Sequence, residues 1–249
     1  MARALGDVLH HFDPSFAKAR PGLSEARAGA PRAALAAVPL APGDLLRAGA
    51  VWNLAVEIAR LGAAGLVLAP AGDLVVGLDE GPGPLGTRVE RFAGEEPGRA
   101  ARARADACAA PGAVLALACL PEAGFERAFA SDLAWALLLA APDAASLGEA
   151  ERMAERVVAV RPDARVGLTI HGARSVGEAR DAFERLARVV ERQSGCGLTS
   201  YGLLVDDLAI YRAIVERRPV GLARPQSPAA RALADVARLL LADAREAPR

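Results

Sequence analysis

Few side chains in this chain could perform chemistry, and they are scattered. Lys18 is the only lysine among thirty basic residues, so chemistry that needs a lysine at a phosphate, a Schiff base or a proton must use Lys18 or do without. The three cysteines, Cys108, Cys119 and Cys196, form no C-x-x-C pair and have no histidine nearby in sequence. This pattern argues against both a disulfide framework and a structural zinc site.

Known catalytic motifs are absent from the sequence. It contains no G-x-S-x-G and no H-E-x-x-H, so we expect no catalytic residues of the hydrolase or metalloprotease kind. Residues 81–86 match G-x-G-x-x-G, but Pro82 and Pro84 remove two amide donors, and residues 87–92 do not open a clear helix. A dinucleotide fingerprint needs those amides at a helix start, so we interpret residues 81–86 as a surface loop.

One pair of adjacent aspartates and one pair of adjacent histidines could also form a site. Asp206 and Asp207 follow an apolar run, at the strand end where open α/β sheets bind ligands. Taken alone, Asp207 is better explained as the N-cap of the next helix. His10 and His11 are adjacent in a helical pattern and cannot face one metal ion, so we expect no metal site there.

The composition excludes several classes of protein. Of 249 residues, 53% are hydrophobic, and thirty basic residues balance thirty acidic ones. The apolar content argues against disorder, and zero net charge gives no overall field that would attract nucleic acid or an anionic membrane. The sequence shows neither a signal-peptide layout nor an apolar run of about 20 residues, so we expect a cytoplasmic protein with reduced thiols.

Hydrophobic periodicity divides the chain into residues 1–31, a short helix over 2–12 followed by a linker, and one domain over 32–249. The apolar runs of this domain are continuous, which is typical of parallel strands buried on both faces. We therefore predict a three-layer α/β/α, doubly wound, mainly parallel sheet. Strands are expected at 34–40, 65–70, 73–78, 113–120, 133–140, 165–170 and 201–205, and helices at 48–61, 100–110, 146–160, 175–192, 207–217 and 227–244.

The loop between the first strand and helix is the natural place for a phosphate. In P-loop proteins this loop is glycine-rich, and a lysine and a hydroxyl residue stand at the helix start. Here residues 40–48 contain a single glycine, Gly43, together with Asp44 and Arg47, and no serine or threonine.

Several segments, in order, resemble the MinD/ParA-type ATPases of the SIMIBI class, especially the FlhG-like branch that regulates flagellar number. Residues 201–207 (Tyr-Gly-Leu-Leu-Val-Asp-Asp) resemble the family's Gly-x-Ile-Pro-x-Asp. Further matches lie at 53–62, 137–150, 165–175, 213–220 and 225–230. The resemblance covers residues 32 to 243, and it implies a P-loop NTPase fold.

The departures from the family concern its nucleotide site. The Walker A motif Lys-Gly-Gly-Val-Gly-Lys-Thr falls on residues 42–48, where Pro42 and Arg47 replace both lysines and Ala48 replaces the hydroxyl residue. Asp-x-Asp becomes Ala-Pro-Ala at 69–71, and the Walker B segment, 118–124, has no aspartate at its strand end. The resemblance therefore implies a vestigial nucleotide site consisting of Gly43, Arg47, Ala48, His171 (in place of the asparagine that reads the base) and Asp207.

Phosphoryl transfer depends on lysine, magnesium and loop amides, so their joint loss predicts a pseudo-ATPase without cofactor. We expect a non-hydrolysing regulatory or interaction subunit of flagellar, polar-localisation or cell-organisation machinery, whose partner is an active homologue or a polar or flagellar component. One alternative is a divergent ATPase that binds ATP and Mg²⁺ through an atypical phosphate loop; another is a binder of a different small ligand near His171 and Asp207. Dimerisation in the family depends on ATP, so here it stays open. The tail, residues 227–249, mixes acids with arginines and predicts no direct membrane anchor.

Overall fold

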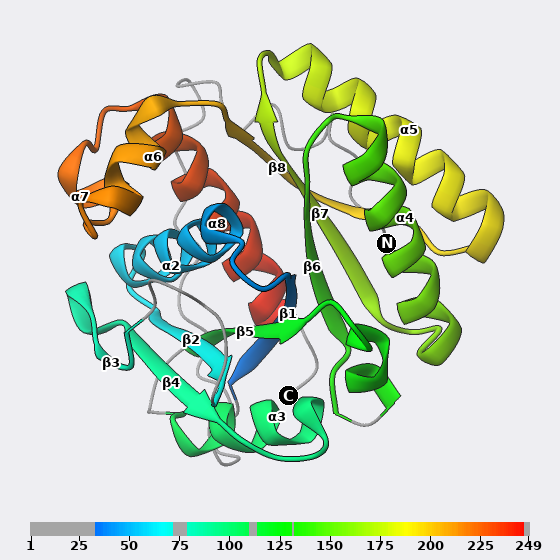
Figure 1. Ribbon diagram of the computed structural model, residues 1–249, viewed down its shortest axis with the longest axis horizontal. Coiled ribbons are helices and arrows are strands. Elements are labelled where there is room, and N and C mark those ends of the chain that lie inside the picture. The colour runs from blue at the N-terminus through cyan, green and yellow to red at the C-terminus, as the bar shows by residue number, and fades with distance from the viewer. Residues whose placement is uncertain (1–32, 72–78, 110–113, 131, 247–249) are drawn as a thin grey trace.

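A single eight-stranded sheet forms the centre of the protein (Figure 1). The computed structural model describes residues 33–71, 79–109, 114–130 and 132–246. The strand order is β3-β4-β2-β5-β1-β6-β7-β8, and every neighbouring pair is parallel except β3 and β4. The strands are β1 (Ala34–Leu40), β2 (Ala64–Pro70), β3 (Gly81–Pro82), β4 (Arg88–Phe92), β5 (Val114–Pro121), β6 (Trp135–Ala140), β7 (Arg165–Ala173) and β8 (Thr199–Val205).

Helices cover both faces of the sheet (Figure 1). On one face lie α2 (Leu45–Arg60), α6 (Leu208–Val215), α7 (Val220–Ala223) and α8 (Pro228–Glu246). The other face is covered by α3 (Pro97–Ala107), the 3₁₀ helix η4 (Phe125–Ala130), α4 (Ala144–Val160) and α5 (Val176–Ser194). A second short 3₁₀ helix, η3 (Pro84–Gly86), precedes β4.

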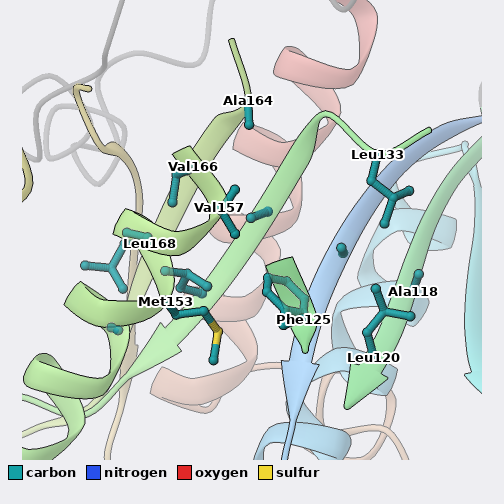
Figure 2. Packing of buried hydrophobic residues seen from close by; sticks show 14 of the residues in the cluster. Ala118, Leu120, Phe125, Leu133, Met153, Val157, Ala164, Val166 and Leu168 are labelled. Carbon is teal, nitrogen blue, oxygen red and sulfur yellow. The ribbon is translucent and has the colours of Figure 1, made fainter. Parts of the chain in front are cut away.

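Alternate residues of each central strand bury into opposite layers. In β5, Leu115 and Leu117 belong to the core under α2 and α8, while Ala116 and Ala118 belong to the core under α3 to α5. Figure 2 shows part of the second core, to which Met153 and Val157 of α4 and Val166 and Leu168 of β7 belong. Because helices cover both faces of the sheet, a strand made only of apolar residues is stable here. The predicted three-layer α/β/α fold is confirmed.

Most expected elements are present, with shifted ends. The first strand has the bounds predicted for it, whereas α2 begins three residues before 48, because Asp44 caps it. The expected helix over 2–12, the linker and the strand at 73–78 lie outside the described residues.

Residues 81–92 differ from the prediction. Residues 81–86 are not a plain loop, since β3 pairs with β4 and η3 follows. The strand β4, which the sequence did not predict, pairs in parallel with β2. It is short and carries Arg88 and Arg91 among its apolar residues, so its pattern lacks the continuous apolar run of the central strands. Among the helices that the structure describes, none has the length and apolar content needed to cross a membrane.

Candidate functional site

The loop between β1 and α2 is closed by its own hydrogen bonds. The amide of Asp44 donates to the carbonyl of Ala41 (3.2 Å), and that of Leu45 donates to the carbonyl of Gly43 (2.8 Å). The Asp44 carboxylate accepts the amide of Arg47 at 2.9 Å and thereby caps α2. A helix N-terminus attracts an anion, and here the anion is a side chain of the loop itself.

Arg47 projects from the first turn of α2 into a group of carboxylates. Its Nη1 lies 2.6 Å from Oε1 of Glu122, its Nε lies 3.3 Å from Oδ2 of Asp44, and its Nη2 lies 3.8 Å from Oε2 of Glu149. Only 15% of the Arg47 side chain is exposed. We call Asp44, Arg47, Glu122 and Glu149 the ion-pair cluster.

The cluster joins three elements at the carboxyl edge of the sheet. Glu122 follows the last residue of β5, and its amide donates to the carbonyl of Leu40 at the end of β1 (3.3 Å). Glu149 comes from α4. Burial, and then the neighbouring Glu149 carboxylate, raise the pKa of Glu122, against the opposing effect of Arg47. One guanidinium therefore faces three carboxyl groups, and the local charge is negative when all three are ionised.

This arrangement does not fit a bound magnesium nucleotide. A phosphate needs free amides and uncompensated cations. Here Arg47 is already paired, and the neighbouring carboxylates would repel the phosphate. Ala48 is 2% exposed and offers no side-chain oxygen for a metal. No group of three or more His, Cys, Asp or Glu side chains suited to a metal ion occurs among the described residues.

A cavity of about 250 Å³ lies beside the cluster, between α2, α6 and the ends of β6, β7 and β8. Its wall is mostly aliphatic, and Arg47 and His171 both line it. Burial, and then the positive charge of Arg47, lower the pKa of His171, so its imidazole is neutral near pH 7. Its Nε2 is buried and has no hydrogen-bond partner among the described residues. The other lining residues are Leu46, Ala50, Leu139, Ala141, Gly172, Leu204, Val205, Asp206, Ile210 and Tyr211.

Asp207 joins two helices and does not line this cavity. Its Oδ1 accepts the amide of Ala209 (2.8 Å), and its Oδ2 accepts the amide of Ala229 (3.0 Å). The carboxylate therefore caps both α6 and α8, and the capping interpretation of Asp207 is confirmed. The neighbouring Asp206 lines the cavity instead and accepts a hydrogen bond from the Tyr211 hydroxyl (3.3 Å).

The structure brings together only part of the expected set. Arg47 and His171 line one cavity, whereas Gly43 is exposed in the turn, with φ of +79°, and Ala48 is buried in the core. Sequence reasoning missed Glu122 and Glu149. Glu122 carried a usable signal, because it directly follows a buried strand, where open α/β sheets place their ligand-binding residues. Nothing in the sequence singles out Glu149 from the other acids of α4.

Comparison with known structures identifies the fold. The cell division protein MinD from Aquifex aeolicus superposes on this chain with a TM-score of 0.65 at 14% identity, over 84% of this chain and 97% of that one. This chain has the MinD/ParA-type P-loop ATPase fold. No protein-family model matches the sequence, and no curated protein matches it significantly.

Two further solved structures support the same assignment. MinD from Pyrococcus horikoshii OT3, solved in complex with Mg-ADP, has a TM-score of 0.58 at 13% identity and covers 84% of this chain and 96% of that one. A ParA family ATPase from Chlorobium tepidum TLS has a TM-score of 0.57 at 11% identity and covers 82% and 98%. At these identities the likeness concerns the fold. In this chain the ion-pair cluster lies at the loop between β1 and α2, and the cavity lies at the neighbouring strand ends.

Proposed function

We propose that this chain is a pseudo-ATPase: a MinD/ParA-like protein that acts without nucleotide as a regulatory or interaction subunit. The observation that carries the proposal is the ion-pair cluster. Asp44 takes the anion position at the start of α2, and Arg47 is bound to Glu122 at 2.6 Å. For a phosphate to enter, these pairs would have to break and three carboxylates would remain beside it, which opposes binding.

The partner we propose is an active homologue or a polar or flagellar component. A MinD/ParA-like fold whose first loop is closed by its own side chains can serve as a scaffold for protein contacts without nucleotide chemistry. The cellular setting we propose is flagellar, polar-localisation or cell-organisation machinery, in line with the FlhG-like features of the sequence.

A titration with ATP and ADP, each with and without Mg²⁺, tests the pseudo-ATPase proposal. We expect no saturable binding below about 1 mM, which corresponds to less than about 4 kcal/mol of binding free energy. MinD from Pyrococcus horikoshii, whose structure holds Mg-ADP, serves as the positive control. Magnesium-dependent binding in the micromolar range would overturn the proposal.

Phosphate release separates the divergent-ATPase alternative from the proposal. If the chain hydrolyses ATP through an atypical loop, release above the buffer rate should vanish in Arg47→Ala, because Arg47 is the only basic side chain of the loop at residues 41–48. Release that stays at the buffer rate, with candidate partners present, supports the pseudo-ATPase.

The cavity gives the small-ligand alternative one observation in its favour. A volume of about 250 Å³ is small for a ligand pocket but has mostly apolar walls with a few polar groups, among them His171 and Tyr211. Adenosine, which lacks phosphates, is the matched probe in the same titration. Saturable adenosine binding that needs no Mg²⁺ and is lost in Ala50→Leu would assign the cavity to a ligand.

A further inference from the structure

The outer face of α6 is unusual for a helix at a protein surface. Arg212 is the only charged residue among the eight of this helix. Leu208, Tyr211 and Val215 are 60%, 42% and 83% exposed, and together with Arg212 they form one face, which we call the α6 stripe. A helix that is apolar on all sides is normally covered on all sides. In Figure 1, α6 lies at the periphery of the fold, beside α7.

The α6 stripe cannot turn inward, because the other face of α6 is already packed. Ala209, Ile210 and Ala213 are buried in the core shared with α2 and α8. Ile214 lies so close to Gly49 of α2 that a Cβ there would come within 2.7 Å of its Cγ1. The two helices are thus fixed against each other, and the exposed side chains stay outside.

Charges at the two ends of the α6 stripe have opposite signs. At its start, the exposed Asp206 carboxylate accepts only the Tyr211 hydroxyl among the described residues. Past its end, Arg217 makes a solvent-exposed pair with Asp79 (3.3 Å), and Arg212 makes no ion pair with any described residue. Exposed pairs of this kind contribute little, so Arg217 can exchange its partner at small cost.

We propose that the α6 stripe is a nucleotide-independent dimer interface, on which the stripe of a second copy lies antiparallel. A two-fold axis between Tyr211 and Arg212 sets Leu208 of one copy opposite Val215 of the other. The same axis sets each Tyr211 ring opposite an Arg212 guanidinium, and each Asp206 opposite Arg217. Such self-complementarity is what an isologous interface requires. Antiparallel helices also place opposite dipole ends together.

The inference rests on the proposed function in one respect: the dimer, like the pseudo-ATPase, needs no nucleotide. Sedimentation equilibrium of the full chain without nucleotide and with EDTA, from about 1 to 200 μM, is the test, and we expect a reversible dimer with a micromolar Kd. Val215→Asp should weaken it at least tenfold, because the change buries two carboxylates, each opposite the apolar Leu208 of the other copy. Val176→Asp, at an exposed valine on α5 in the opposite layer, should leave it unchanged.

A charge exchange makes the result independent of folding. Asp206→Arg should weaken the dimer severalfold by setting arginine against arginine, and adding Arg217→Asp should restore it to within about threefold. A chain that stays monomeric to about 200 μM, or a dimer indifferent to Val215→Asp or to the charge exchange, would overturn this inference alone. A dimer that forms only with Mg-ATP would overturn the inference together with the pseudo-ATPase proposal.

Discussion

The ion-pair cluster and the cavity lie side by side at the carboxyl edge of the sheet, and Arg47 belongs to both. The cluster is filled with its own side chains: three carboxylates, one of which also caps α2, and one guanidinium. The cavity keeps a volume of about 250 Å³ and a histidine nitrogen with no described partner. The loop at the start of α2 is therefore occupied by side chains of the protein itself, whereas the neighbouring strand ends still enclose space.

The two regions are held by different contacts. The loop between β1 and α2 is closed locally, because Asp44 accepts an amide at the start of α2 and pairs with Arg47. The cavity depends on the positions of α2 and α6 at the strand ends. The caps made by Asp207 and the close approach of Ile214 to Gly49 hold these helices in place.

Removing the cation should have the largest effect on stability. Arg47→Met leaves Glu122 and its carboxylate neighbours without a counter-charge in a half-buried site, and we expect a loss of about 2–3 kcal/mol in the free energy of unfolding near pH 7. Urea denaturation measures it. Arg47→Lys should lose less, because it keeps the charge but not the fork of contacts. A loss below about 0.5 kcal/mol for Arg47→Met would show that the cluster does not hold the loop closed.

The next largest effect compares two alanines on α2, of which only one lines the cavity. Ala48 is buried and does not line the cavity, so Ala48→Leu should cost about 1–3 kcal/mol through overpacking. Ala50 lines the cavity, so Ala50→Leu should change stability by less than about 1 kcal/mol. Equal costs at the two positions, measured by urea denaturation, would mean that the cavity does not accept side chains.

The pH dependence of stability should carry the signature of Glu122. Its pKa is raised in the folded state, so the folded protein takes up this proton first, and stability increases as the pH falls from 7 through the raised pKa. Glu122→Gln lacks this gain, so the stability of the unchanged protein relative to the variant should rise on acidification.

Glu178 is the matched control, with the opposite sign. Its pKa is lowered by Arg174, so its contribution is present above the unfolded value of 4.5 and is lost as the pH falls through the lowered pKa. Urea denaturation at several pH values compares Glu122→Gln with Glu178→Gln. The same slope for both variants would contradict the raised pKa of Glu122.

The smallest effect links the two parts of the cleft through His171. Since burial is the main cause of its lowered pKa and Arg47 the second, Arg47→Gln should raise that pKa without bringing it fully to 6.5. NMR titration of the imidazole signals measures the shift, with His171→Asn to assign them and Arg174→Gln as a control. An unchanged pKa in Arg47→Gln would place Arg47 too far from the cavity to act on it.

The sequence predicted the fold better than the site. Continuous apolar strands such as 133–140 and amphipathic helices such as 175–192 gave the layers, because burial on both faces of a parallel sheet leaves a pattern in the chain itself. The polar strand β4 left no such pattern. The partners of Arg47 were not predictable either, since Glu122 and Glu149 are 75 and 102 residues away from it in the chain.

The sequence by itself determined the three-layer fold and a loop over residues 41–48 with no lysine, no hydroxyl residue and a single glycine. Only the tertiary structure decided which side chains meet at this loop. It brought Glu122 and Glu149 to Arg47, and it assigned Asp207 to two helix caps. The physical reason is that an apolar pattern acts through local periodicity, whereas an ion pair forms between side chains that only the packed sheet brings within 4 Å of each other.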